Sequence, residues 1–254
     1  MLMKQFLEKR MKPNLSDQEF FDLYVKDNNW FPLQNHGLID KKVKLKEEDL
    51  DFPNQVTTYL NLFKNIKINN QSILDIGCGW GRGTHIIKKY FEKCDVTGID
   101  VNPSYIDYAK SHFKECNYLQ DNFFNTKIKK NSFDFIVSNC SMHFFYNYDL
   151  PFNNFKKILK PGGKVLITDL WTDESFFTFL TKCNQHEMKV LSMKDLTNQT
   201  IQAMEEDVSL TFNKFKGKIS KNAISAFIDI QSERLTFFKQ NINRQYKFII
   251  KKEK

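Results

Sequence analysis

Four glycines alternate at positions 77, 79, 81 and 83, directly after a short apolar run that contains Asp75. The chain has only nine glycines in 254 residues, so most of its loops are built without them. Glycine lets the backbone adopt a positive φ and approach a ligand closely. A strand that enters a glycine turn and then a helix is the usual setting of a nucleotide-binding loop. The chemistry we expect here is the binding of a nucleotide-like cofactor by backbone amides.

The spacing of these glycines argues against a dinucleotide. That fingerprint needs Gly or Ala five positions after its first glycine, and the two registers place Arg82 and Thr84 there. The carboxylate of Asp75 would oppose a pyrophosphate, whereas it suits a ligand with a positive amino group. No GKS or GKT follows the loop, which excludes the P-loop NTPases. Asp100, about 20 residues further on, is placed to bind both hydroxyls of a ribose.

Five ordered motifs resemble those of the class I S-adenosylmethionine-dependent methyltransferases, over residues 55–172. The first two are the family's DxGxGxG loop and the acidic residue that ends its second strand. The others are an Asp after the third strand, a characteristic fourth strand, and a Pro-Gly-Gly turn before the fifth. The matching positions are Asp75, Gly77, Gly79 and Gly81, then Asp100, Asp121, residues 133–139 and residues 160–163.

The resemblance implies S-adenosylmethionine as the cofactor, with S-adenosylhomocysteine as the product. It implies that the glycine loop contacts the methionine end, that Asp75 and the backbone near Asn139 face the ammonium, and that Asp100 binds the ribose. The loop after the third strand would bind the edge of the adenine ring and form part of the apolar walls around it. In chain order, the implied cofactor-binding residues are Asp75, Gly77, Cys78, Gly79, Gly81, Asp100, Val101, Asp121, Asn122, Phe123 and Asn139.

Missing motifs narrow the class of methyl acceptor. After the expected fourth strand the chain reads Ser-Asn-Cys-Ser over 138–141, not the Asp/Asn-Pro-Pro-aromatic of enzymes that methylate base amino groups. There is no Pro-Cys pair for cytosine methylation, and no Glu between Glu115 and Glu174 for the paired glutamates of protein-arginine methyltransferases. Small-molecule methylation is the class that remains.

A histidine follows the expected fourth strand. The stretch Ser-Met-His-Phe-Phe over 141–145 resembles the His-aromatic stretch of the quinone-biosynthesis and natural-product branch of the family. We therefore take His143 as the candidate general base, because imidazole titrates in a useful range; a packing role is the alternative. His36 lies in a segment weakly similar to a lid loop of some relatives, and a loop or core role is preferred for it.

Aromatic residues cluster after the expected fourth and fifth strands, where α/β sheets bind their ligands. They either line a pocket for an apolar or aromatic acceptor or pack in the core. The favoured hypothesis is transfer of a methyl group to an oxygen of such an acceptor. The alternatives are a non-catalytic cofactor-binding or partner subunit and, less favoured, an NAD-type oxidoreductase. The aromatic residues are Phe144, Phe145, Tyr146, Phe152, Trp171, Phe176, Phe177 and Phe179.

Short apolar runs alternate with amphipathic stretches over residues 71–172, which predicts an α/β fold with a Rossmann-like, doubly wound, mostly parallel sheet. A helical cap or lid is expected over 1–70, with a capping box at Ser16 and Glu19. Residues 173–254 are expected to form helices that wall the acceptor pocket, inserted before a last strand. The expected strands are 72–76, 95–99, 117–120, 133–138, 164–169 and 246–250, and the expected helices are 53–65, 84–91, 103–113, 150–159, 173–186, 195–215 and 220–240.

The amino-acid composition limits which binding partners and which cellular compartment we expect for the protein. The formal net charge is +8, yet only four of the 38 basic residues are Arg, so nucleic acid is not expected as a partner. Whether the basic excess serves an anionic substrate or reflects composition alone stays open. The five dispersed cysteines predict reduced thiols and no metal. No run approaches the ~20 apolar residues of a membrane span, so we expect a cytoplasmic protein with a small-molecule acceptor and an oligomeric state left open.

Overall fold

The computed structural model describes residues 35–215 and 221–252. Within them, one seven-stranded sheet has the order β3-β2-β1-β4-β5-β7-β6. Strands β1 to β5 pair in parallel, whereas β7 pairs antiparallel with both β5 and β6. This confirms the predicted doubly wound, mostly parallel sheet. The expected capping box at Ser16 and Glu19 lies outside the described residues.

The first half of the sheet follows the predicted βαβ pattern closely. The helix after β2 begins where Asn102 caps it, since the Asn102 side chain accepts a hydrogen bond from the Ser104 amide (2.9 Å) and Pro103 occupies the first turn. The elements are β1 (Ser72–Ile76), α4 (Arg82–Tyr90), β2 (Asp95–Asp100), α5 (Pro103–His112) and β3 (Asn117–Gln120).

The second half contains one strand that the sequence analysis missed. Most side chains of β6 are exposed, because it forms the edge of the sheet, so it lacks the alternating pattern of a half-buried strand. The Pro-Gly-Gly turn also lies within β5 as a bulge, because Phe133 pairs with Leu159 and Phe135 with Lys164. The elements are β4 (Phe133–Asn139), η3 (Met142–Phe144), α6 (Asp149–Ile158), β5 (Leu159–Trp171), α7 (Asp173–Gln185), β6 (Met188–Asp195) and β7 (Arg244–Lys252).

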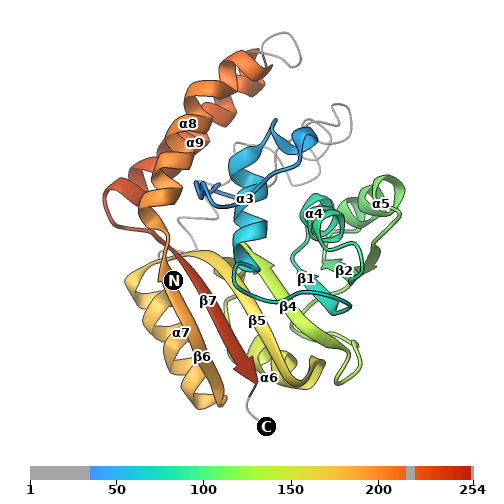
Figure 1. The fold of residues 1–254 in the computed structure, drawn as a ribbon. Helices are drawn as coiled ribbons and strands as arrows, with labels where there is room; N and C mark the ends of the chain where they lie inside the picture. Colours follow the sequence, from blue (N-terminus) through green and yellow to red (C-terminus); the bar gives the residue numbers. More distant parts are fainter. Residues whose placement is uncertain (1–34, 216–220, 253–254) are drawn as a thin grey trace.

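Helices cover both faces of the sheet (Figure 1). On one face, α3 (Pro53–Leu62), α4 and α5 enclose one apolar core, and on the other face α6 and α7 enclose a second. The short helix η2 (Glu47–Asp49) precedes α3. Helix α3 ends at Leu62, three residues before its expected end. No helix among the described residues is long and apolar enough to cross a membrane.

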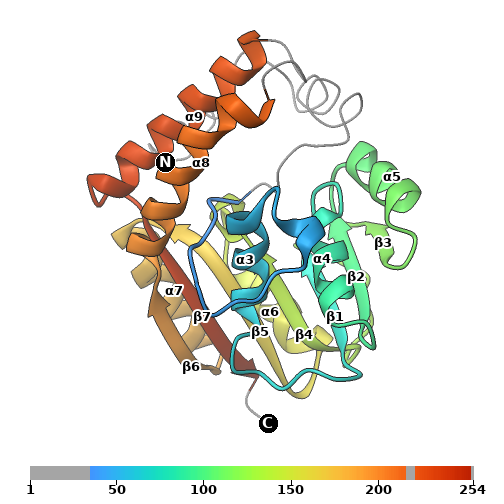
Figure 2. The ribbon, with the colours of Figure 1, turned by 45° about the horizontal axis from the view of Figure 1, so that its top comes forward.

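Two long helices extend beyond the carboxyl edge of the parallel strands. Helices α8 (Thr197–Phe215) and α9 (Lys221–Lys239) lie side by side, and together they form the insertion expected before the last strand (Figures 1 and 2). The insertion is fastened to α3, since Asn54 donates a hydrogen bond to Asp207 of α8 (3.2 Å) and Gln55 bonds the same carboxylate. The helical insertion therefore overhangs the edge at which the predicted site residues lie.

Candidate active site

The glycine loop turns sharply at the end of β1. Gly77, Gly79 and Gly81 have φ values of 68°, 55° and 85°, a region that L-residues with a side chain seldom adopt. The Gly77 and Cys78 amides both donate to the Ile99 carbonyl, at 2.9 and 3.0 Å, which fixes the loop against the end of β2. A Cβ at Gly81 would lie 2.5 Å from the Ala109 Cβ, so only glycine fits at the start of α4.

Asp100 terminates β2 beside this loop. Its Oδ2 accepts a hydrogen bond from the Gly79 amide (2.9 Å), and its Oδ1 accepts one from the Asn102 amide (3.0 Å). Two backbone donors thus fix the carboxylate at the end of β2, beside the glycine loop. The ribose role of Asp100 stays a prediction.

Asp75 is buried within β1, where its Oδ2 accepts a hydrogen bond from the Thr84 hydroxyl (2.8 Å). Burial, opposed by the Thr84 bond and reinforced by the negative charge of Asp100, raises the Asp75 pKa to about 7. A positive group bound beside it would restore the carboxylate form. Asp75 can therefore respond to the ammonium that the family resemblance places near it.

The loop after β3 is tied to Asp100 by its backbone. The Asp121 amide donates to the Asp100 carbonyl (3.0 Å), while the Asp121 carboxylate accepts from the Asn122 amide (2.8 Å) and from Thr126. Phe123 is buried, with its ring 5.4 Å from that of Phe155. The Asp121 carboxylate thus accepts hydrogen bonds within its own turn. The adenine roles of Asp121, Asn122 and Phe123 stay predictions. Val101, next to Asp100, is 59% exposed and free to cover a ligand.

Asn139 lies at the end of β4 with unused hydrogen-bonding capacity. Its side chain is buried, and neither amide atom has a hydrogen-bond partner among the described residues. The next residue, Cys140, has a φ of 55° and donates its amide to the Thr168 carbonyl (2.9 Å). Buried polar atoms without partners are rare in folded proteins. The Asn139 amide is thus suited to a bound polar ligand.

His143 forms a pair with Asp169 that the sequence analysis did not foresee. The Nδ1 atom of His143 lies 2.6 Å from Oδ1 of Asp169, and the His143 side chain is only 8% exposed. Asp169 is fully buried and also accepts bonds from the Met142 and Leu170 amides, at 2.6 and 2.7 Å. A carboxylate on Nδ1 fixes the ring and leaves Nε2 to act as the base. In the sequence, the sign of this partner is Asp169 itself, a single Asp at the end of the apolar run expected to form the strand 164–169.

His36 has the core position that was preferred for it. It is buried, its Nδ1 lies 3.5 Å from the Cys140 Sγ, and its ring meets that of Phe238 edge-on at 5.3 Å. Burial lowers the His36 pKa well below its usual value, and the positive charge of Arg234 lowers it further. His36 is therefore neutral, and it links α9 to the end of β4.

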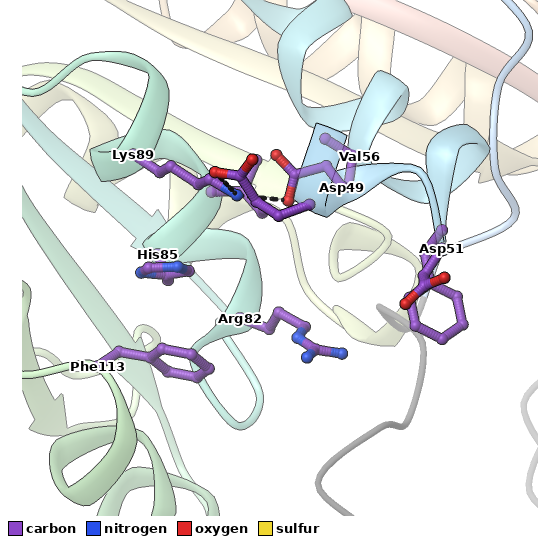
Figure 3. Close-up of a pocket in the computed structure, with 10 residues that line it drawn as sticks. Asp49, Asp51, Val56, Arg82, His85, Lys89 and Phe113 are labelled. Atoms are coloured by element: carbon purple, nitrogen blue, oxygen red, sulfur yellow. Dashed lines mark hydrogen bonds and ion pairs between the residues drawn. The ribbon is translucent and has the colours of Figure 1, made fainter. Parts of the chain in front are cut away.

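A separate pocket lies on the outer side of α4 (Figure 3). It is lined by Arg82, His85 and Lys89 of that helix and by residues of η2 and α3. The cation of Lys89 is paired with Asp49 (2.7 Å). None of the predicted cofactor residues lines this pocket, so it is distinct from the glycine-loop site.

Residues 67–208, more than half of the chain, match a family model described as a methyltransferase domain. The chain belongs to this methyltransferase family. It is 20% identical over 195 residues to phthiotriol/phenolphthiotriol dimycocerosates methyltransferase 1 of Mycobacterium ulcerans, which covers 70% of this chain and 72% of that protein.

Two solved methyltransferases share the fold. Geranyl diphosphate C-methyltransferase from Streptomyces coelicolor, solved with S-adenosylhomocysteine, has a TM-score of 0.65 and 11% identity, over 86% of this chain and 90% of the other. Haemonchus contortus phosphoethanolamine N-methyltransferase 2, also with S-adenosylhomocysteine, has a TM-score of 0.65 and 21% identity, over 78% of this chain and 52% of the other.

The protein is thus an S-adenosylmethionine-dependent methyltransferase with the class I fold. The chain's own residues fit this cofactor: the glycine loop turns sharply at the end of β1, the Asp100 carboxylate lies beside it, and the buried side-chain amide of Asn139 has no hydrogen-bond partner among the described residues. The family assignment also decides against the oxidoreductase alternative.

Proposed function

We propose that this enzyme methylates an oxygen of a small, apolar or aromatic acceptor, with His143 as the general base. The observation that carries the proposal is the buried His143–Asp169 pair, at 2.6 Å, where β4 and β5 end. The two solved relatives described above are named for small organic molecules, geranyl diphosphate and phosphoethanolamine, which supports a small-molecule acceptor.

The chemistry divides simply between cofactor and protein. Bound S-adenosylmethionine supplies an electrophilic methyl group on a positive sulfur. His143 takes the proton of the acceptor hydroxyl through Nε2, and Asp169 stabilises the imidazolium that results. The Gly77–Gly81 turn, Asp100 and Asn139 orient the cofactor, which removes the entropic cost of aligning the two reactants.

The aromatic cluster divides into a core part and a surface part. Phe152, Trp171 and Phe179 are fully buried and pack on one another, so for them the core alternative is correct. Phe144 and Tyr146, just after His143, are 60% and 70% exposed. We assign these two to the mouth of the acceptor pocket, with residues 173–254 as the pocket region over the core of residues 71–172.

The proposal is tested by incubating the purified enzyme with methyl-labelled S-adenosylmethionine and small-molecule extracts of cells, then identifying the labelled products. We expect a labelled ether or ester that is absent when His143→Ala is used. Binding of the cofactor with no transfer in any extract would instead support a non-catalytic subunit. A labelled amine or carbon product would refute the oxygen assignment.

A further inference from the structure

The fourth alternating glycine, Gly83, is required for a different reason from the other three. It lies in the first turn of α4 and, unlike Gly77, Gly79 and Gly81, has no positive φ. A Cβ at this position would overlap the hydroxyl oxygen and the Cζ atom of Tyr59, a residue of α3. Glycine is therefore needed here because a tyrosine hydroxyl lies directly against the α-carbon.

Tyr59 reaches the glycine loop from the helix that precedes β1. Helix α3 packs beside α4 (Figure 2), and Tyr59 is 6% exposed, in the apolar core that also contains Val137 of β4. Burial raises the pKa of Tyr59 well above its usual value, and the negative charge of Asp75 raises it further. The hydroxyl is therefore protonated and lies at the first turn of α4 as a hydrogen-bond donor.

The side-chain amide of Asn139 lies on the same face of the sheet. Strand β4 pairs with β1 so that Val137 lies beside Asp75, and Asn139 follows two residues later on the same face. The chain then stays beside the glycine loop, since the Ser141 hydroxyl donates to the Ile76 carbonyl (2.9 Å). Both amide atoms of Asn139 are buried without a hydrogen-bond partner among the described residues. This amide is therefore available to a ligand bound at the loop.

The first turn of α4 adds backbone donors that suit an anion. The helical bonding begins with the His85 amide, which donates to the Gly81 carbonyl (2.9 Å). Amides before it have no acceptor within a helix, and the helix dipole makes this end positive. On the same turn, Thr84 bonds the carboxylate of Asp75 (2.8 Å), which suits a cation. Donors for an anion thus lie beside an acceptor for a cation, as an amino-acid group with both charges requires.

We propose that the Tyr59 hydroxyl, together with the first turn of α4 and the Asn139 amide, binds the carboxylate of the methionine part of S-adenosylmethionine. The cofactor has an ammonium and a carboxylate on one carbon atom, and the family resemblance assigns Asp75 to the ammonium but no side chain to the carboxylate. A hydroxyl bonds a carboxylate strongly because the acceptor is charged. The inference concerns the cofactor alone, so it is independent of the proposed acceptor and of the base.

The test compares two ligands that differ only in the carboxylate, S-adenosylhomocysteine and decarboxylated S-adenosylhomocysteine. Calorimetry gives their affinities for the purified wild type and for Tyr59→Phe. We expect the wild type to bind the carboxylate-bearing ligand at least about ten-fold more tightly, the scale of a hydrogen bond to a charged group. Tyr59→Phe should lose most of this preference and bind the decarboxylated ligand as the wild type does. An unchanged preference, or an equal loss of affinity for both ligands, would overturn the proposal.

Tyr118 provides the matched control. It is also a buried tyrosine against the glycine loop, but its hydroxyl already has a protein partner, because it donates to the Gly81 carbonyl (3.0 Å). Tyr118→Phe should therefore leave the ratio of the two affinities unchanged, even if both affinities fall. Loss of the preference in this variant as well would assign it to the loop as a whole and contradict a contact with Tyr59.

A second variant leaves Tyr59 intact. Asn139→Asp places a negative charge where the carboxylate is expected, so affinity for S-adenosylhomocysteine should fall several-fold more than affinity for the decarboxylated ligand. The rise in melting temperature that each ligand causes measures the same preference without calorimetry. A preference equal to that of the wild type would show that the carboxylate lies away from Asn139, which would refute the proposed subsite.

Discussion

The carboxyl edge of the sheet has two halves that are held together differently. At β1, β2 and β3, backbone amides donate to residues about 20 positions away, such as the Gly79 amide to the Asp100 carboxylate and the Asp121 amide to the Asp100 carbonyl. At β4, β5 and β7 the contacts join distant side chains, such as His36 and Cys140, which are 104 positions apart. We assign the cofactor to the first half and the acceptor to the second.

The difference has a physical consequence for substitution. A turn built from positive φ and close backbone contacts has no room for a new side chain. A surface built from side chains on a helical insertion can change its residues and keep its backbone. We therefore expect changes in the first half to affect the cofactor and the fold, and changes in the second to affect turnover and acceptor choice.

The largest effect is expected at the His143–Asp169 pair. His143→Ala should lower kcat by about 10²–10⁴-fold, the usual contribution of a general base, with little change in S-adenosylmethionine affinity. The matched control is His186→Ala, because His186 also bonds an aspartate, Asp149 at 2.8 Å, on the surface. Steady-state kinetics and calorimetry separate the two quantities. Equal turnover of the two variants would reduce His143 to a packing residue.

The next effect concerns stability and compares two glycines with positive φ. Gly81→Ala should destabilise the fold by about 2–4 kcal/mol, from the left-handed backbone and from overpacking against Ala109. Gly162, with a φ of 79°, has only the Lys251 Cε at 4.0 Å near its would-be Cβ, so Gly162→Ala should cost about 1–2 kcal/mol. Urea unfolding measures both. Similar losses of unfolding free energy in the two variants would show that the glycine loop is not packed more tightly than the turn at Gly162.

A smaller effect is expected for the ribose carboxylate. Asp100→Ala should weaken S-adenosylmethionine binding by roughly 1–3 kcal/mol, because the hydrogen bonds of a buried polar site are lost. Asp95→Ala, at the exposed opposite end of the same strand, is the control and should bind normally. Calorimetric titration gives both affinities. An unchanged affinity in Asp100→Ala would remove that residue from the cofactor site.

The smallest effect is a pH dependence from Asp75. Its pKa of about 7 lies above the usual value for Asp, so the folded protein binds more protons than the unfolded chain between about pH 4 and 7, and apo stability falls as pH rises through that window. Binding of an ammonium beside Asp75 favours the carboxylate, so cofactor affinity should rise several-fold from pH 6 to pH 7.5. The Asp75→Asn variant should bind more weakly and lack this slope. A flat wild-type profile would contradict the assignment.

The same division explains what the sequence could predict. The glycine loop, Asp100 and the order of strands β1 to β5 follow from local spacing, so they were predicted together with the family. Asp169 was not, because its role depends on which distant residues the fold places beside it. Strand β6 was missed because an edge strand with mostly exposed side chains has no periodic signal. The sites of chemistry in the second half therefore required the structure.

A crystal structure of the enzyme with S-adenosylhomocysteine tests the account most directly, because it locates the sulfur relative to both halves of the sheet edge. We predict that Asp100 contacts the ribose, that Asn139 contacts the methionine end, and that the open side of the sulfur faces Nε2 of His143. A ligand bound away from the glycine loop, or a sulfur whose open side faces away from His143, would contradict it.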